Sequence, residues 1–125
     1  ILSATTSTSS DLPIEIHGEP MTGNRTGYTA IYSVDSKGNY KRETSHVFTG
    51  KVAKAKIYLD NDQYGLRDWG PAEQEKVIIH ELGHALALTH PECGAYAVMQ
   101  QGVGNYGALT IQYHDESCLK MKWGN

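Results

Sequence analysis

The chain of 125 residues lacks the features that mark several classes of protein. It has no apolar run near the roughly 18 residues that a membrane-spanning helix needs, so no membrane contact is expected. Its 14 acidic and 11 basic side chains give a formal charge of −3, whereas a nucleic-acid-binding domain would carry a basic face. Because 39% of its residues are hydrophobic, the chain can bury a core. We therefore expect one domain over residues 1–125, and a monomer.

Cysteine is also scarce, with Cys93 and Cys118 alone. Two cysteines are too few for a zinc site of four cysteines, and the sequence contains no set of two cysteines and two histidines typical of a structural zinc site. In a small extracellular domain two cysteines usually pair, whereas in the cytosol they stay reduced, so both alternatives remain open here. The first residue is Ile1 rather than Met, which indicates a fragment or a processed product.

Three segments are typical of β-strands. Ile14 and Ile16 flank Glu15 in a short alternation, and residues 28–34 are rich in β-branched and aromatic side chains. A turn over residues 35–39 predicts that the second strand returns through Tyr40 as a hairpin. Apolar and polar residues then alternate over residues 54–59, as in a half-buried strand. Lys51, Lys54 and Lys56 are spaced as its outward face, so we interpret them as solvated surface charge.

The second half of the chain changes to helical periodicity. Pro71 fits a first helical position, and apolar residues at 77, 78, 82, 85, 86 and 88 follow helical spacing. This helix should end before Pro91. A glycine-rich stretch follows, and a short helix is expected over about residues 114–123. Strands followed by helices predict an α+β domain, with a small mixed sheet packed on the long helix.

The most informative segment is His80-Glu81-Leu82-Gly83-His84. Residues four apart on a helix lie on the same face, about 6 Å apart along the axis, so His80 and His84 can bind one metal ion. Glu81 points elsewhere and can take a proton from a water molecule bound to that metal. This is the zinc metalloprotease pattern, and the alternative is a set of histidines that are only packed or solvated.

A third histidine, His90, follows His80 by ten residues. Three imidazole ligands with one open position are the arrangement of a catalytic Zn²⁺ site. His17, His46 and His114 lack ligand spacing and are interpreted as surface or loop residues.

The segment from His80 to His90 resembles the extended zinc signature of the metzincin metallopeptidases. Met99, nine residues after His90, matches the methionine turn of that family. The likeness is greatest to small secreted bacterial enzymes of the matrixin-like and snapalysin-like kinds. It is specific over residues 80–99 and softer over 27–125. It implies zinc ligands at His80, His84 and His90, a general base at Glu81, a sheet packed on the zinc-binding helix and a C-terminal helix.

Two departures from the family pattern bear on the site. The family has glycine where this chain has Ala87, and a left-handed alanine costs roughly 1–2 kcal/mol. Either the turn lies elsewhere or the strain is tolerated, and Glu92 is the alternative third ligand. Residues 1–13 are too few for the family's first strand, long helix and second strand, so we expect an N-terminal portion to be missing or the fold to be pared down.

The resemblance also implies a disulfide between Cys93 and Cys118, because such enzymes pack the terminal helix beneath the loop that holds Cys93. A disulfide would indicate a secreted, extracellular protein, and two free thiols are the alternative. Tyr106 is expected to be a core or pocket-wall residue rather than a hydrogen-bond donor to the substrate.

The function expected is a zinc-dependent metalloendopeptidase, in which a zinc-bound water is activated by Glu81 and attacks the peptide bond. The peptide or protein substrate should pair with an edge strand over residues 28–34, beside a pocket walled by residues 99–106. The alternatives are a zinc hydrolase acting on a non-peptide amide, and a zinc-site module without activity.

Overall fold

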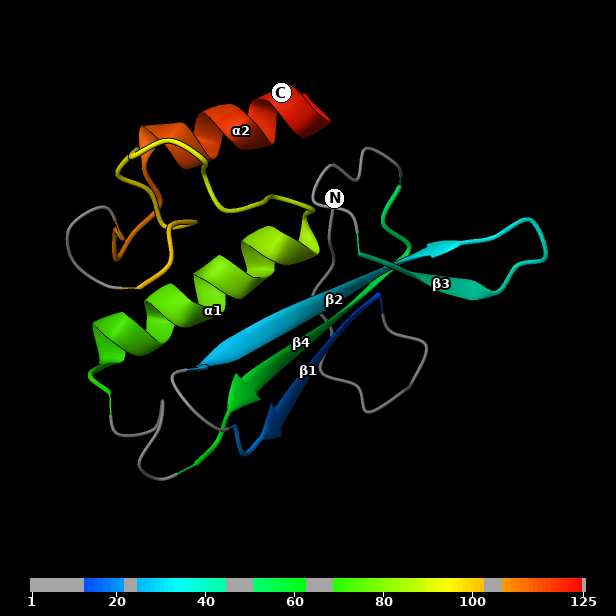
Figure 1. Cartoon of the computed structure of the whole chain (residues 1–125), viewed down its shortest axis with the longest axis horizontal. Helices are drawn as coiled ribbons and strands as arrows, with labels where there is room; N and C mark the ends of the chain where they lie inside the picture. The colour runs from blue at the N-terminus through cyan, green and yellow to red at the C-terminus, as the bar shows by residue number, and fades with distance from the viewer. Residues whose placement is uncertain (1–12, 22–24, 45–50, 63–68, 103–106, 125) are drawn as a thin grey trace.

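The computed structural model describes residues 13–21, 25–44, 51–62, 69–102 and 107–124. These residues form four strands and two helices, an α+β arrangement that confirms the expected fold class (Figure 1). The elements are β1 (Ile14–Glu19), β2 (Gly27–Val34), β3 (Tyr40–Glu43), β4 (Lys54–Asp60), α1 (Pro71–Ala85) and α2 (Tyr113–Trp123). Within the described part of the chain, neither helix is long and apolar enough to cross a membrane.

The sheet is mixed, with the strand order β1-β4-β2-β3. Strand β4 pairs in parallel with β1 and antiparallel with β2, so the expected strand over residues 54–59 is one of the two inner strands of the sheet. Strand β3 pairs with only the second half of β2, from Ile31 to Val34. The first half of β2, residues 27–30, therefore keeps one edge free of β3. The expectation that residues 28–34 form an edge strand is therefore wrong for residues 31–34, which pair with β3, and only the first half of β2 has an edge that β3 does not cover.

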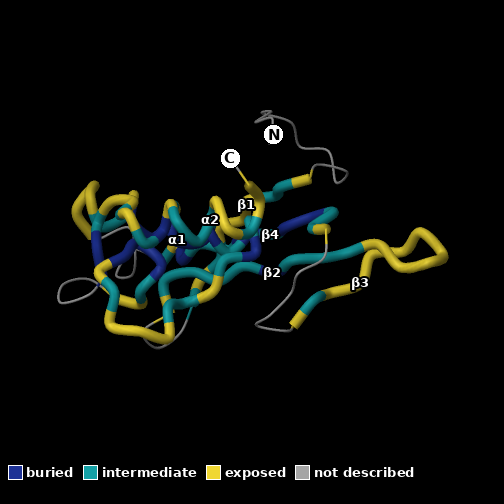
Figure 2. The backbone as a smooth tube through the Cα atoms, turned by 90° about the horizontal axis from the view of Figure 1, so that it is seen from above, coloured by how far each residue is buried: buried dark blue, intermediate teal, exposed yellow. Residues whose placement is uncertain are grey.

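Helix α1 covers one face of the sheet and forms the core with it. Ala55 and Ile57 of β4 are 1% exposed and pack with Ala85 of α1, as their alternation in the sequence predicts. Ile14, Ile31, Leu59 and Leu82 surround this cluster. Figure 2 shows buried residues along β4 and α1, whereas the turn between β2 and β3 and most of β3 are exposed.

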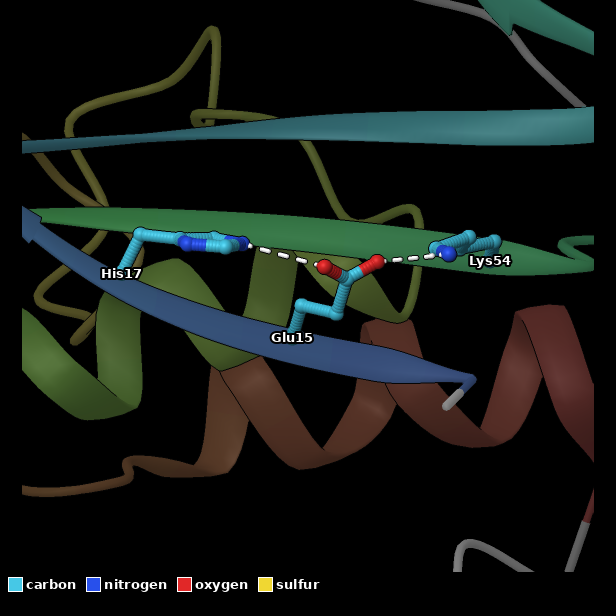
Figure 3. Close-up of polar contacts among 3 residues, drawn as sticks. All are labelled: Glu15, His17 and Lys54. Atoms are coloured by element: carbon cyan, nitrogen blue, oxygen red, sulfur yellow. Dashed lines mark hydrogen bonds and ion pairs between the residues drawn. The ribbon is translucent and has the colours of Figure 1, made fainter. Parts of the chain in front are cut away.

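The opposite face of the sheet carries charge, but not as predicted. Lys54 is only 7% exposed, because its ammonium group forms an ion pair of 2.5 Å with Glu15 on β1. His17 lies 3.2 Å from the other oxygen of the same carboxylate (Figure 3). The interpretation of Lys54 as solvated charge was therefore wrong, since the parallel pairing of β1 with β4 supplies a partner for it.

Helix α1 begins at Pro71 as expected but ends at Ala85, before the apolar residues 86 and 88. The reason is a left-handed turn at Ala87, whose φ is 61°. The Ala87 amide donates to His84 O over 2.8 Å and the Leu88 amide donates to Gly83 O over 3.0 Å. This is the double hydrogen bond of a Schellman cap, in which the left-handed position usually holds glycine.

Candidate metal centre

Three histidines converge, two from the C-terminal half of α1 and one from the segment that follows it. The Nε2 atom of His90 lies 3.0 Å from Nε2 of His80 and 3.2 Å from Nε2 of His84. The chain therefore turns at Ala87 and tolerates the strain, and the turn brings His90 back to the helix. The ligand atoms of the three residues are close enough together to hold one metal ion. Glu92 is exposed and is not part of this cluster, so the alternative ligand is not needed.

Hydrogen bonds to backbone carbonyls orient the two helical histidines. His80 Nδ1 donates to Val98 O and His84 Nδ1 donates to Leu88 O, each over 2.8 Å. A carbonyl oxygen only accepts, so both rings carry their proton on Nδ1 and present an Nε2 lone pair to the common centre. Tetrahedral coordination with zinc–nitrogen bonds of about 2.0–2.1 Å separates the ligand nitrogens by about 3.3 Å, close to the spacing found here.

Burial keeps His80 in the form that binds metal. The residue is 8% exposed, and desolvation lowers the pKa of its ring from 6.5 to about 3, although the hydrogen bond to Val98 opposes that shift. His80 is therefore neutral at pH 7. A metal ion binds neutral imidazole, so no proton has to leave this ligand.

A carboxylate lies beside the histidines on the face of α1 that meets the sheet. Glu81 is 5% exposed, and Thr29 Oγ1 of β2 donates to its Oε2 over 2.6 Å. Burial raises the pKa of Glu81, while the hydrogen bond from Thr29 and the charges of His84 and Lys76 act in the opposite direction. A buried carboxylate with a raised pKa and a fixed orientation is suited to accept a proton.

The turn over residues 97–100 lies beneath the histidines. Met99 is 3% exposed and packs on α1 at Gly83, where an added Cβ would lie 2.2 Å from the Met99 sulfur. A glycine inside the helix lowers helix stability by about 1 kcal/mol relative to alanine, and here it is needed for this close approach. The expected place of Met99 under the histidines is thus found in the structure.

Asp115 of α2 holds this turn in place. Its Oδ2 accepts from the amides of Val98 and Gln112, both over 2.8 Å, and its Oδ1 accepts from the amide of Met99 over 3.1 Å. The residue is 5% exposed. Because Val98 O binds His80, one carboxylate on α2 positions a histidine on α1. Sequence reasoning missed Asp115, although its spacing from Gln112 fits a capping box at the start of a helix.

A cavity of about 610 Å³ opens over the histidines and Glu81. The first half of β2 forms one wall and α1 forms the floor. Trp69, Gln101 and Gly102 also line it. The expected wall residue Tyr106 lies outside the described residues, as does His46.

The two cysteines are free thiols in the structure, so the expected disulfide between Cys93 and Cys118 is not formed. The imidazole of His114 lies between them, with Nε2 3.6 Å from Cys93 Sγ and Nδ1 3.7 Å from Cys118 Sγ. The ring of His114 thus lies between the two sulfur atoms, with one of them at each ring nitrogen. The extracellular location that a disulfide would have indicated stays a prediction.

Comparison with known proteins adds no further assignment. No family model matches the chain, and neither a curated protein nor a solved structure matches it. The α+β fold and a three-histidine cluster able to bind a metal ion are therefore what is established for this protein.

Proposed function

We propose that the protein is a zinc-dependent metalloendopeptidase of the metzincin kind. The observation that carries the proposal is the convergence of three Nε2 atoms from His80, His84 and His90 beside the buried carboxylate of Glu81. Three imidazole ligands with room for a fourth ligand suit a catalytic Zn²⁺ ion better than a structural one.

The protein's own groups supply the acid–base chemistry. Zinc, when bound, would polarise the scissile carbonyl and lower the pKa of the attacking water. Glu81 accepts a proton from that water as it attacks the carbonyl carbon. The same carboxyl group then gives the proton to the leaving amine nitrogen, so the carboxylate is restored at the end of the cycle. Thr29 holds Glu81 in place through the 2.6 Å hydrogen bond.

The sheet offers a place for the substrate backbone. Gly27, Tyr28 and Thr29 of β2 line the cavity, and β3 pairs only with residues 31–34. An extended peptide can therefore add to this open edge by main-chain hydrogen bonds and pass over Glu81. A peptide or protein substrate is the partner that this geometry suits.

The test is cleavage of casein and of a peptide library by the zinc-loaded protein, with and without a chelator. We expect cleavage that the chelator abolishes. Substitution of Glu81 by glutamine should lower the turnover about 10²–10⁴-fold while zinc binding and the unfolding temperature stay unchanged, because an amide cannot accept the proton. Glu116→Gln, an exposed site on α2, is the matched control and should retain full activity. Normal hydrolysis by the Glu81→Gln protein would refute the assigned base, and absence of cleavage by the wild type would refute the proposed function.

A further inference from the structure

Helix α1 places a lysine in the wall of the cavity, one turn before the first histidine. Lys76 is 3% exposed and lines the cavity together with Val77 and His80. Its Nζ donates to Gln100 O over 2.6 Å. The spacing of Lys76, His80 and His84 by four residues puts all three on one stripe of the helix.

The ammonium group of Lys76 has bonding capacity left over. An ammonium carries three N–H donors, and Gln100 O takes one of them. His80 Nδ1 lies 3.5 Å from Nζ, but this nitrogen already donates its proton to Val98 O and cannot accept another. Among the described residues, Lys76 forms no ion pair.

The nearest carboxylates are already engaged. Asp115 accepts from three backbone amides, and Glu81 accepts from Thr29. A buried charge is normally paired, because leaving it unpaired is costly. The charges of Glu81 and Asp115 act on Lys76, but within the described part of the chain neither carboxylate forms a direct ion pair with its ammonium group.

We propose that Lys76 determines substrate specificity by binding an acidic side chain, glutamate or aspartate, next to the bond that is cleaved. This inference rests on the proposed peptidase function. Lys76 precedes His80 by about 6 Å along the helix axis, which is comparable to the reach of an extended glutamate side chain. A substrate held on the open edge of β2 can therefore direct such a side chain toward Lys76 while its backbone lies over Glu81.

The first test measures selectivity in cleavage. The best peptide from the library is resynthesised with Glu, Gln or Leu at each position that flanks the cleaved bond. At one of these positions we expect the wild type to prefer Glu over Gln by about 10- to 100-fold in kcat/KM, as for a charge-assisted hydrogen bond. Lys76→Met should remove this preference, Lys76→Arg should retain most of it, and the exposed control Lys120→Met should leave it unchanged.

This selectivity ratio does not depend on how much of a variant is folded, because each protein is compared with itself. Equal rates for Glu and Gln in the wild type would overturn the proposal. A preference that survives in Lys76→Met would overturn it equally.

The second test separates this inference from the proposed function. Binding of the Glu and Gln peptides to the zinc-loaded Glu81→Gln protein is measured by calorimetry, with and without Lys76→Met. Tighter binding of the Glu peptide that disappears with Lys76→Met would support the inference even if the wild type cleaves no peptide. Cleavage by the wild type without any such difference in binding or rate would leave the peptidase in place and refute the role of Lys76.

Discussion

Replacement of Asp115 by asparagine tests whether α2 positions the turn that orients His80. The carboxylate accepts three backbone hydrogen bonds, two at Oδ2 and one at Oδ1. An asparagine has one oxygen. With that oxygen at the Oδ2 position, the bonds from Val98 and Gln112 remain, while the amide nitrogen faces the N–H group of Met99.

The expected cost follows from this count. One hydrogen bond to a charged acceptor is lost, worth about 1.5–3 kcal/mol, and the buried Met99 amide is left without its partner. The two remaining bonds lose their charge assistance. We expect the free energy of unfolding to fall by about 2–4 kcal/mol, a large part of the roughly 5–15 kcal/mol of a domain of this size.

The Asp115→Asn substitution should also lower the affinity for zinc. Val98 O accepts from His80 Nδ1, so a displaced turn releases the orientation of His80. Loss of such an outer contact typically lowers metal affinity about 10- to 100-fold. Urea unfolding of the metal-free protein at pH 7 gives the stability, and competition with a chelator gives the zinc affinity.

Glu116→Gln is the control, because Glu116 is exposed in the same first turn of α2. A change in unfolding free energy below about 0.5 kcal/mol for Asp115→Asn, relative to this control, would refute the hydrogen-bond argument. Lost stability with unchanged zinc affinity would refute the link from Asp115 to His80.

Three further predictions concern α1 and its contacts. Thr29→Val should lower kcat about 10-fold with KM nearly unchanged, because Glu81 loses the hydroxyl that orients it. Thr29→Ser keeps a hydroxyl and should retain the rate of the wild type. Equal rates for the two variants would exclude this role of Thr29. Gly83→Ala should destabilise the protein by about 1–3 kcal/mol through its clash with Met99, and the cost should disappear in a Met99→Ala background; a double-mutant cycle without coupling would contradict the contact. The pKa of His80 is lowered from 6.5 to about 3, so below pH 6.5 the unfolded state binds a proton that the folded state does not. As the pH falls from 6.5 towards 3, the unfolding free energy of the metal-free protein should decrease by up to about 1.4 kcal/mol per pH unit. This dependence on pH should be absent in His80→Asn. The same dependence in both proteins would contradict the burial of His80.

Local sequence patterns determined most of the elements and the helical part of the site. Alternation over residues 54–59 predicted the strand whose Ala55 and Ile57 form the core. Pro71 and the spacing of the apolar residues predicted the start of α1. His80 and His84 share a face because a helix repeats every 3.6 residues, so their juxtaposition follows from the sequence alone.

The other half of the site depended on contacts between elements. His90 reaches the centre because Ala87 adopts a left-handed conformation, and local propensity argues against that conformation in alanine. The sequence pattern gave only a limit for the end of α1, before Pro91, since residues 86 and 88 continue the helical pattern past the turn. The two hydrogen bonds of the Schellman cap offset the strain at Ala87, and only the structure shows them.

Partners distant in sequence were decided by tertiary structure alone. Thr29 meets Glu81 across 52 residues, and Asp115 meets Val98 across 17. Lys54 is buried because β1 brings Glu15 beside it, and the thiols of Cys93 and Cys118 stay apart because the ring of His114 lies between them. A periodic pattern reports which face of an element is apolar, but it carries no information on which element packs against that face. The packing of the sheet, α1 and α2 therefore decided which side chains surround the three histidines.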